Sequence, residues 1–507
     1  MVKKGKAEAE TYADFIKESK EEESEEEEEV EAEAAAPKAT VTMQKLEEVK
    51  VKVAESSLSA IRRLLALYRL ACRVNDNPSA SASLFADSKT FNEVITYTLD
   101  CLPPFFHKRL SKQGKDSPHW KALGSPLRNF LACTAALLKQ VTQNELLKFV
   151  YGRLKQAATV MQLHENYAKK IGKLAAGHWA EGDKGVVLVT YDFLRTLLAT
   201  PGTDALPLYR RLFLVYISHS VHLTWDNYSR LSLLRSTYTA LLGLDLSAAY
   251  QVTFQHLRQL ALHLLSITKT PTKDALKTLV NWQNLSSLWL LAQCIRHYSK
   301  DLGEMRYPLV QICAGMLRLV NSFQHTPFRL HLLRVMVMME SGGEAFIPQT
   351  SAYITDLIAS PELYKRARHT EENMAKTFEF YTALKVSKGD GKSEGFRYQL
   401  VEEICDVVVE HMAVWGRSVG LVEMWLGMRG VLLRASKKAK NPAARGKLQH
   451  VIQQIDESCV QVTSLRSTAP IHSLSPLSVP SPLEVLRDRI LQTRKDMIAA
   501  RSEEANS

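Results

Sequence analysis

The fold of this chain is constrained most by an apolar helical pattern that proline and glycine interrupt at nearly regular intervals. Apolar side chains such as Leu146 and Val150 recur three to four residues apart. The interruptions come about every 20 to 25 residues, and Pro308, Pro327 and Pro348 each stand where a helix would begin. Two such helices make a hairpin near 40 residues long, the length of a HEAT or armadillo repeat. The pattern predicts an all-α fold, an irregular HEAT/armadillo-like α-solenoid, with one globular helical domain as the alternative.

The composition agrees with a folded helical chain. Gly (22 of 507) and Pro (18) are scarce, whereas a many-stranded sandwich or barrel needs many turn residues. A hydrophobic content of 46% is enough for a core. No apolar run reaches the length of a membrane span, and the N-terminus lacks the apolar stretch of a secretory signal. The seven dispersed cysteines form no C-x-x-C pair, which is typical of reduced thiols in cytosol or nucleus.

Charge is distributed very unevenly along the chain. The 65 basic and 54 acidic residues give a net charge of +11. Residues 1–36 hold 14 acids and five lysines, a net of −9, so the remainder holds 60 basic and 40 acidic residues, a net of +20. A basic body indicates contact with nucleic acid or another polyanion. The acidic tail either keeps the chain soluble or competes for the same basic surface.

These patterns predict four regions. Residues 1–40 are expected to be a disordered acidic tail, because ten glutamates between Glu21 and Glu33 repel one another. Residues 41–115 are an N-terminal helical segment with loops, and a further loop is expected from Ser111 to Pro126. Residues 116–466 are the helical-repeat body. Residues 467–507 are a Ser/Pro linker followed by a short C-terminal helix.

Two short motifs resemble catalytic signatures but lack their context. Gly416-Arg-Ser418-Val-Gly420 matches G-x-S-x-G, yet the nucleophile elbow needs a preceding strand, and Cys405 and Met412 are spaced as on a helix. A serine hydrolase that uses Ser418 is therefore only a remote alternative.

The second motif is Gly391-Lys-Ser393, which resembles the end of a phosphate-binding loop. The first glycine of that motif would fall on Val386, so the motif fails. The loop 386–396 is expected to be flexible. The fifteen histidines show no spacing typical of metal ligands. We expect no catalytic residue, cofactor, metal or small-molecule substrate, and therefore no enzyme.

The best candidate for a binding surface is the stretch 424–455, which contains no Asp or Glu. Its cations can neutralise several phosphates, and the release of counterions would then drive binding to nucleic acid. Lysines on a loop would bind the backbone without reading bases. The alternative is an ordinary solvated connection between two helices. The predicted nucleic-acid residues are Arg429, Arg434, Lys437, Lys438, Lys440, Arg445 and Lys447.

An ordered set of short strings resembles the nucleolar complex protein 2 family. The resemblance covers roughly residues 115–460, and its strings occur in the family's order. The upstream strings are His119-Trp120-Lys121 and Asn144-Glu-Leu-Leu-Lys-Phe-Val150. The central strings are Leu241-Leu-Gly-Leu-Asp-Leu246, Ala249-Tyr250, Leu257-Arg-Gln-Leu-Ala-Leu-His263, Val280-Asn-Trp-Gln283, Tyr307-Pro-Leu-Val-Gln-Ile312, Pro327-Phe-Arg-Leu-His331 and Phe346-Ile-Pro348. Phe396-Arg397 and the helices through Ile455 follow.

The resemblance implies a non-enzymatic helical-repeat factor of the nucleolus and nucleoplasm. Such proteins form heterodimers with nucleolar complex protein 1-type and 3-type partners. They act on pre-rRNA and large-subunit pre-ribosomal particles, in maturation and intranuclear transport. We expect an assembly factor for the large ribosomal subunit, with no membrane partner. A karyopherin-like nuclear transport receptor shares the expected fold and is the main alternative.

Overall fold

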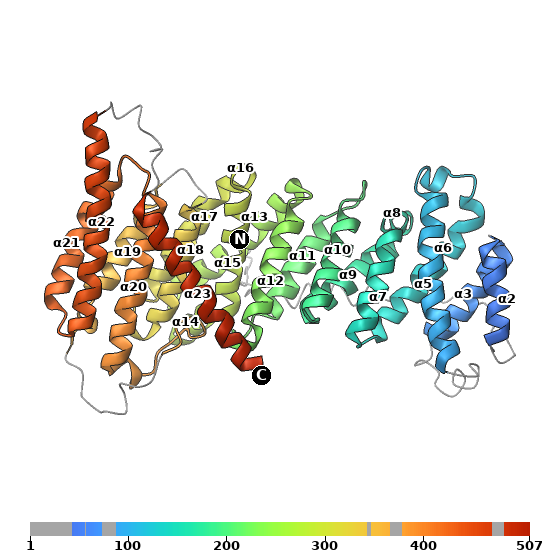
Figure 1. Ribbon diagram of the computed structural model, residues 1–507, viewed down its shortest axis with the longest axis horizontal. Coiled ribbons are helices and arrows are strands. Elements are labelled where there is room, and N and C mark those ends of the chain that lie inside the picture. The colour runs from blue at the N-terminus through green and yellow to red at the C-terminus, as the bar shows by residue number, and fades with distance from the viewer. Residues whose placement is uncertain are drawn as a thin grey trace, which may run out of the picture. The chain divides into compact units, whose positions relative to one another are not determined.

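The computed structural model describes residues 43–55, 57–72, 88–341, 346–365, 378–468 and 481–506. Within these ranges every element of regular structure is a helix (Figure 1). This confirms the predicted all-α class. The acidic tail predicted for residues 1–40 and most of the predicted Ser/Pro linker lie outside the described residues.

The chain divides into two compact units. The first contains the described residues up to 219 together with 236–252. Its α-helices are α2 (Met43–Ala54), α3 (Leu58–Cys72), α5 (Ser88–Leu110), α6 (Trp120–Gln140), α7 (Asn144–Leu154), α8 (Ala158–Met161), α9 (Glu165–Glu181), α10 (Lys184–Leu198) and α11 (Leu206–Ser218). Short 3₁₀ turns are η1 (Gly114–Asp116), η2 (Lys155–Ala157) and η3 (Gln162–His164).

The second unit contains residues 220–235 and the described residues from 253 onward. Its α-helices are α14 (Lys273–Leu279), α15 (Trp282–His297), α16 (Ser299–Leu302), α17 (Arg306–Leu319), α18 (Thr326–Glu340), α19 (Pro348–Ala359), α20 (Glu394–Val414), α21 (Leu421–Lys438), α22 (Pro442–Thr468) and α23 (Pro482–Asn506). The 3₁₀ turns are η4 (Gly303–Met305), η5 (Phe323–His325), η6 (Pro361–Tyr364) and η8 (Asp390–Lys392). Helices α12 (Trp225–Leu242) and α13 (Leu246–Lys269) supply residues to both units.

Within each unit, helices pack on near neighbours in sequence. In the first unit α6 contacts α3 and α9, and α10 contacts α7 and α9. The buried Trp179 donates to Thr237 Oγ1 at 3.0 Å, and Tyr209 donates to the carbonyl of Leu241 at 2.8 Å. These bonds satisfy the polar ends of large aromatic side chains whose rings fill the core.

Local residue choice explains many helix ends. Asp183, Thr272, Asn281 and Ser393 each cap a helix by accepting a bond from a backbone N–H in the first turn. Proline occupies the first turn of α18 and α19, as the sequence predicted, because its missing N–H has no partner there.

The loop predicted from Ser111 to Pro126 is too long. Helix α6 begins at Trp120 and continues through Gly124 and Pro126. A side chain on Gly124 would stand 3.2 Å from the Trp120 ring, so glycine lets that ring lie across the helix. Burial of the apolar face around Phe130 outweighs the hydrogen bond that proline removes.

The loop 386–396 is also more ordered than predicted. Val386 is buried and its N–H donates to the carbonyl of Gln324 at 2.8 Å. The 3₁₀ turn η8 follows, and α20 begins at Glu394. The last helix is 25 residues long rather than short.

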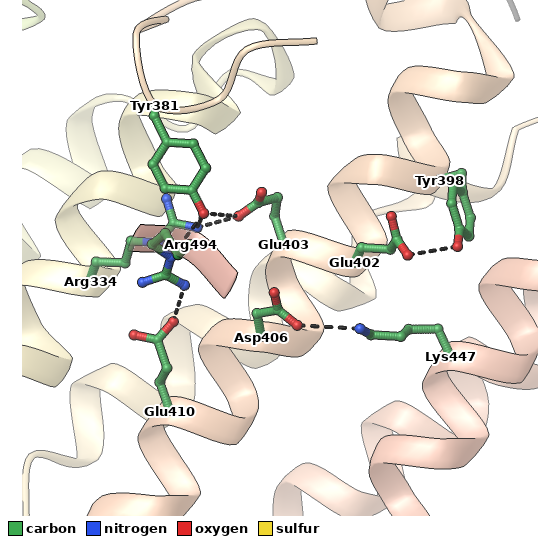
Figure 2. Close-up of polar contacts among 9 residues, drawn as sticks. All are labelled: Arg334, Tyr381, Tyr398, Glu402, Glu403, Asp406, Glu410, Lys447 and Arg494. Carbon is green, nitrogen blue, oxygen red and sulfur yellow. Dashed lines mark hydrogen bonds and ion pairs between the residues drawn. The ribbon is translucent and has the colours of Figure 1, made fainter. Parts of the chain in front are cut away.

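A line of acids on α20 holds the second unit's C-terminal helices together. Glu403, Asp406 and Glu410 lie three and four residues apart and therefore on one face of the helix. Glu403 pairs with Arg334 of α18, and Glu410 pairs with Arg494 of α23 (Figure 2). In Figure 1, α23 lies against α20.

Tyr381 joins the two arginines of this line. Its hydroxyl accepts from Arg494 Nε at 2.9 Å and from Arg334 Nη2 at 3.3 Å, and it donates to Glu403 at 3.3 Å. Burial alone would lower the pKa of Arg334, but Glu403 and Tyr381 outweigh it and the pKa is raised. A buried ion pair adds little net stability, whereas removing one partner is costly. The network therefore fixes where the helices lie.

The other side of α20 is tied to α22. Lys447 Nζ lies 3.4 Å from Asp406 Oδ1 (Figure 2). Burial raises the pKa of Asp406, and the ammonium of Lys447 opposes that rise. Tyr398 donates to Glu402 at 2.6 Å on the same side. The acidic line thus positions α22 as well as α18 and α23.

We predict that Arg494→Met releases α23, because Glu410 would be left buried without its partner. Hydrogen exchange of the amides in 482–506 is expected to become about 100-fold faster. Arg489→Met is the matched control, since Arg489 is exposed on the same helix. Adding Glu410→Gln to Arg494→Met should restore part of the protection. Equal exchange in the Arg489 and Arg494 variants would show that the pair does not hold α23.

We also predict that acid destabilises the second unit through His331. Burial, reinforced by Arg334, lowers the pKa of His331 from 6.5 to about 3. The unfolded chain binds a proton below pH 6.5 and the folded chain does not, so stability is complete above pH 6.5 and is lost as the pH falls.

Between pH 7 and 5 this one group should cost about 2 kcal/mol of unfolding free energy. His331→Leu should remove that part of the loss in urea titrations at the two pH values. His450→Leu, at an exposed position, should not remove it. An unchanged pH dependence in the His331 variant would contradict the assignment.

Candidate nucleic-acid interface

The predicted basic stretch forms a helical hairpin made by α21 and α22. Arg429 of α21 bonds Asp456 of α22 through Nε, at 2.8 and 2.9 Å to the two carboxylate oxygens. The indole of Trp425 donates to the same carboxylate at 2.7 Å. The bond to Asp456 raises the pKa of Arg429. Arg429 therefore holds the two helices together and faces the partner helix.

Two more of the predicted cations have internal partners. Arg445 donates to the carbonyl of Ala439 from Nε at 3.2 Å and from Nη2 at 2.8 Å, which closes the turn between the helices. Lys447 pairs with Asp406, as described above. Arg445 is still exposed, whereas Lys447 is half-buried.

The other four predicted cations face solvent. Arg434, Lys437 and Lys438 are exposed at the end of α21, and Lys440 is exposed in the turn. Among the described residues these four make no ion pair. Lys437 and Lys438 lie on the helix rather than on the flexible loop that we expected for the lysines, and only residues 439–441, which include Lys440, separate α21 from α22.

A cation or two in the last turn of a helix is common, because it complements the helix dipole. That explanation suffices for Lys437 and Lys438. It does not cover Arg434 and Lys440, nor the lack of any acid in the 424–455 stretch. An unneutralised set of this kind can bind phosphates by releasing counterions. The nucleic-acid site remains a prediction.

The two motifs that resemble catalytic signatures have structural roles. Helix α20 precedes Ser418, where a nucleophile elbow requires a strand. The Ser418 Oγ accepts from the N–H of Gly420 at 3.2 Å. Ser393 caps α20 by accepting from Phe396 N at 3.1 Å.

A different Ser–His–acid relay exists in the second unit. Ser351 Oγ lies 2.7 Å from His411 Nε2, and His411 Nδ1 lies 2.6 Å from Glu340 Oε2. A general base must reach its substrate, yet the side chains of His411 and Glu340 are completely buried. The relay therefore links the three helices α18, α19 and α20 to one another.

Among the residues that the structure describes, no three His, Cys, Asp or Glu side chains are grouped so that they could hold a metal ion. None of the described helices combines the length and apolar character needed to span a membrane.

Sequence reasoning missed the acidic line on α20. Its signal was present, because Glu403, Asp406 and Glu410 recur at helical spacing among apolar residues of the segment 400–414. Their partners come from residues far away in the sequence, such as Arg334 and Arg494, and only the fold brings them together.

Comparison of the sequence with known proteins shows the family of the chain. A sequence model of the Noc2p family matches residues 206–478, more than half of the 507 residues. The chain is 27% identical over 431 residues to Nucleolar complex-associated protein 2 of Arabidopsis thaliana, covering 82% of this chain and 56% of that protein. It is 24% identical over 402 residues to Nucleolar complex protein 2 of Drosophila melanogaster, covering 78% of this chain and 52% of that protein.

The Nucleolar complex protein 2 homolog of Caenorhabditis elegans is 21% identical over 292 residues, which cover 54% of this chain and 40% of that protein. The chain thus spans about half the length of the curated relatives it matches. These relatives confirm the predicted location in the nucleus and nucleolus and the resemblance seen in the sequence. The chain belongs to the Noc2p family.

Proposed function

We propose that this chain is a non-enzymatic assembly factor for the large ribosomal subunit. It acts as a scaffold that binds pre-rRNA and partner nucleolar complex proteins, and it supports maturation and intranuclear transport of pre-ribosomes. Membership of the Noc2p family supports this role, together with relatives named as nucleolar complex proteins.

One observation supports the proposed contact with RNA. Arg434, Lys437, Lys438 and Lys440 are exposed, have no ion pair among the described residues, and lie in a stretch without acids. The neighbouring cations Arg429 and Lys447 are used inside the protein, so the fold separates anchoring charges from exposed ones. We call the four exposed residues the basic surface.

We further propose that residues 116–466 form an irregular HEAT/armadillo-like α-solenoid. The segment 41–115 precedes it, and residues 467–507 follow it. The packing within the second unit supports this proposal: α18 contacts α20, α20 contacts α22, and α19 contacts α21. Contacts between helices two positions apart in sequence are typical of stacked hairpins.

The partners proposed for the scaffold are nucleolar complex proteins of the 1 and 3 types. Helix α13 offers a surface for them. Phe254 and Leu265, three helical turns apart, are 51% and 50% exposed, and Leu262 is 46% exposed. Large apolar side chains exposed along one helix are typical of protein interaction sites. Cosedimentation of the chain with pre-ribosomal particles would favour the scaffold over a transport receptor.

We predict that neutralising the basic surface weakens RNA binding and flattens its salt dependence. The quadruple variant changes Arg434, Lys437, Lys438 and Lys440 to Gln. Each lost phosphate contact should reduce the slope of log K against log salt by about 0.7–0.9. Fluorescence anisotropy with labelled RNA at several salt concentrations measures this slope.

The control removes the same amount of charge from four exposed cations on other helices of the second unit. It changes Lys269, Lys273, Lys300 and Arg489 to Gln. If both quadruple variants lower the slope equally, net charge explains the binding and the basic surface is not the site. If neither variant changes the slope, the RNA contact lies elsewhere.

A further inference from the structure

A small cavity opens beside the basic surface in the second unit. Its volume is about 200 Å³, and its walls come from η6, the start of α20 and the turn between α21 and α22. Lys440 belongs both to these walls and to the basic surface. Cavities for drug-sized ligands are larger, roughly 300–1,000 Å³, so this one suits a group of the size of a single nucleobase.

Two tyrosines with fixed rings form part of the walls. Tyr364 donates its hydroxyl to the carbonyl of Ile358 at 2.8 Å, and Tyr398 donates to Glu402 at 2.6 Å. Both side chains are half-buried. Because the hydroxyls are already bonded, what the rings offer a ligand is their flat apolar faces.

The polar lining is mostly cationic. Lys365, Arg397 and Lys440 line the cavity with a single acid, Glu394. Arg397 donates to the carbonyl of Lys365, but its buried Nε has no hydrogen-bond partner. Glu394 accepts from Asn441 at 3.1 Å and keeps its other oxygen for a second donor. The lining thus combines donors for a phosphate with an acceptor for an amino group.

We propose that this cavity holds one unstacked nucleotide of single-stranded RNA, an inference that rests on the proposed function. The tyrosine rings would stack on the base, and Lys440 and Arg397 would contact its phosphate. RNA is recognised mainly through unpaired bases that stack on aromatic side chains, because side chains cannot read the deep groove of the double helix. The basic surface would bind the phosphates of the adjoining nucleotides.

An acidic peptide is the competing ligand for a cationic cavity. Its carboxylates would satisfy Lys440 and Arg397, but they would leave the two tyrosine faces unused and would place a negative charge near Glu394. A nucleotide with adenine, cytosine or guanine supplies a flat ring for the tyrosines, an anion for the cations and an amino group for Glu394. The observations therefore favour RNA.

The test fills the cavity without changing its charge. Ala444 of α22 is buried and lines the cavity, whereas the adjacent Ala443 is exposed and does not. Ala444→Leu is expected to weaken binding of a single-stranded RNA about 5-fold or more, and to lower the salt slope by at most the one phosphate contact made in the cavity, about 0.7–0.9. Ala443→Leu should leave the affinity unchanged, and neither variant should alter binding of a fully paired RNA.

The outcomes separate this inference from the proposed function. If the unchanged protein binds no RNA, the RNA contact of the proposed function fails and this inference fails with it. If it binds and the quadruple variant lowers the salt slope, but Ala444→Leu matches Ala443→Leu, only the cavity is wrong. If Ala444→Leu weakens binding of poly-glutamate and spares single-stranded RNA, the cavity takes an acidic peptide and the inference is overturned.

A second measurement uses the unchanged protein and so does not depend on a variant folding. A single-stranded RNA that carries 2-aminopurine is expected to become protected from quenching by acrylamide when it binds, because one base enters the cavity. A base as accessible in the complex as in free RNA, wherever it is placed along the strand, would overturn the inference.

Discussion

The acidic line of α20 is the constraint on which the second unit's C-terminal helices depend. Glu403 and Glu410 hold α18 and α23, and Asp406 holds α22, each through a cation supplied by the other helix. Charges that are largely removed from solvent tolerate little displacement, since separation leaves an uncompensated ion. The position of α22 follows from this line, and with it the orientation of the hairpin that carries the basic surface.

The sequence predicted most of the secondary structure, because apolar period, proline at helix starts and polar caps are local signals. It failed where packing overrides local preference. Gly124 and Pro126 read as a loop, yet the buried face around Phe130 keeps α6 helical through them. Phe254 and Leu265 are apolar residues of helix α13, yet both side chains are about half exposed. Whether an apolar side chain is exposed depends on which other helix packs against it, and the periodicity of the sequence does not show which helix that is.

The sequence predicted the candidate interface only through the composition of one stretch of residues. The absence of acids from 424–455 pointed to the right hairpin, but it could not divide the seven cations by role. Asp456 lies just outside that window and Asp406 lies on another helix, and these two acids engage Arg429 and Lys447. The cavity was invisible for the same reason. Its tyrosines, Tyr364 and Tyr398, come from separate segments that meet only in the fold.

The RNA contact that we propose for the α21–α22 hairpin would be made in pre-ribosomal particles. Ultraviolet crosslinking in cells, followed by mass spectrometry of the peptides attached to RNA, tests it most directly. We expect crosslinked peptides from the region 434–447. Reproducible crosslinks confined to other parts of the chain, with none in that region, would contradict it.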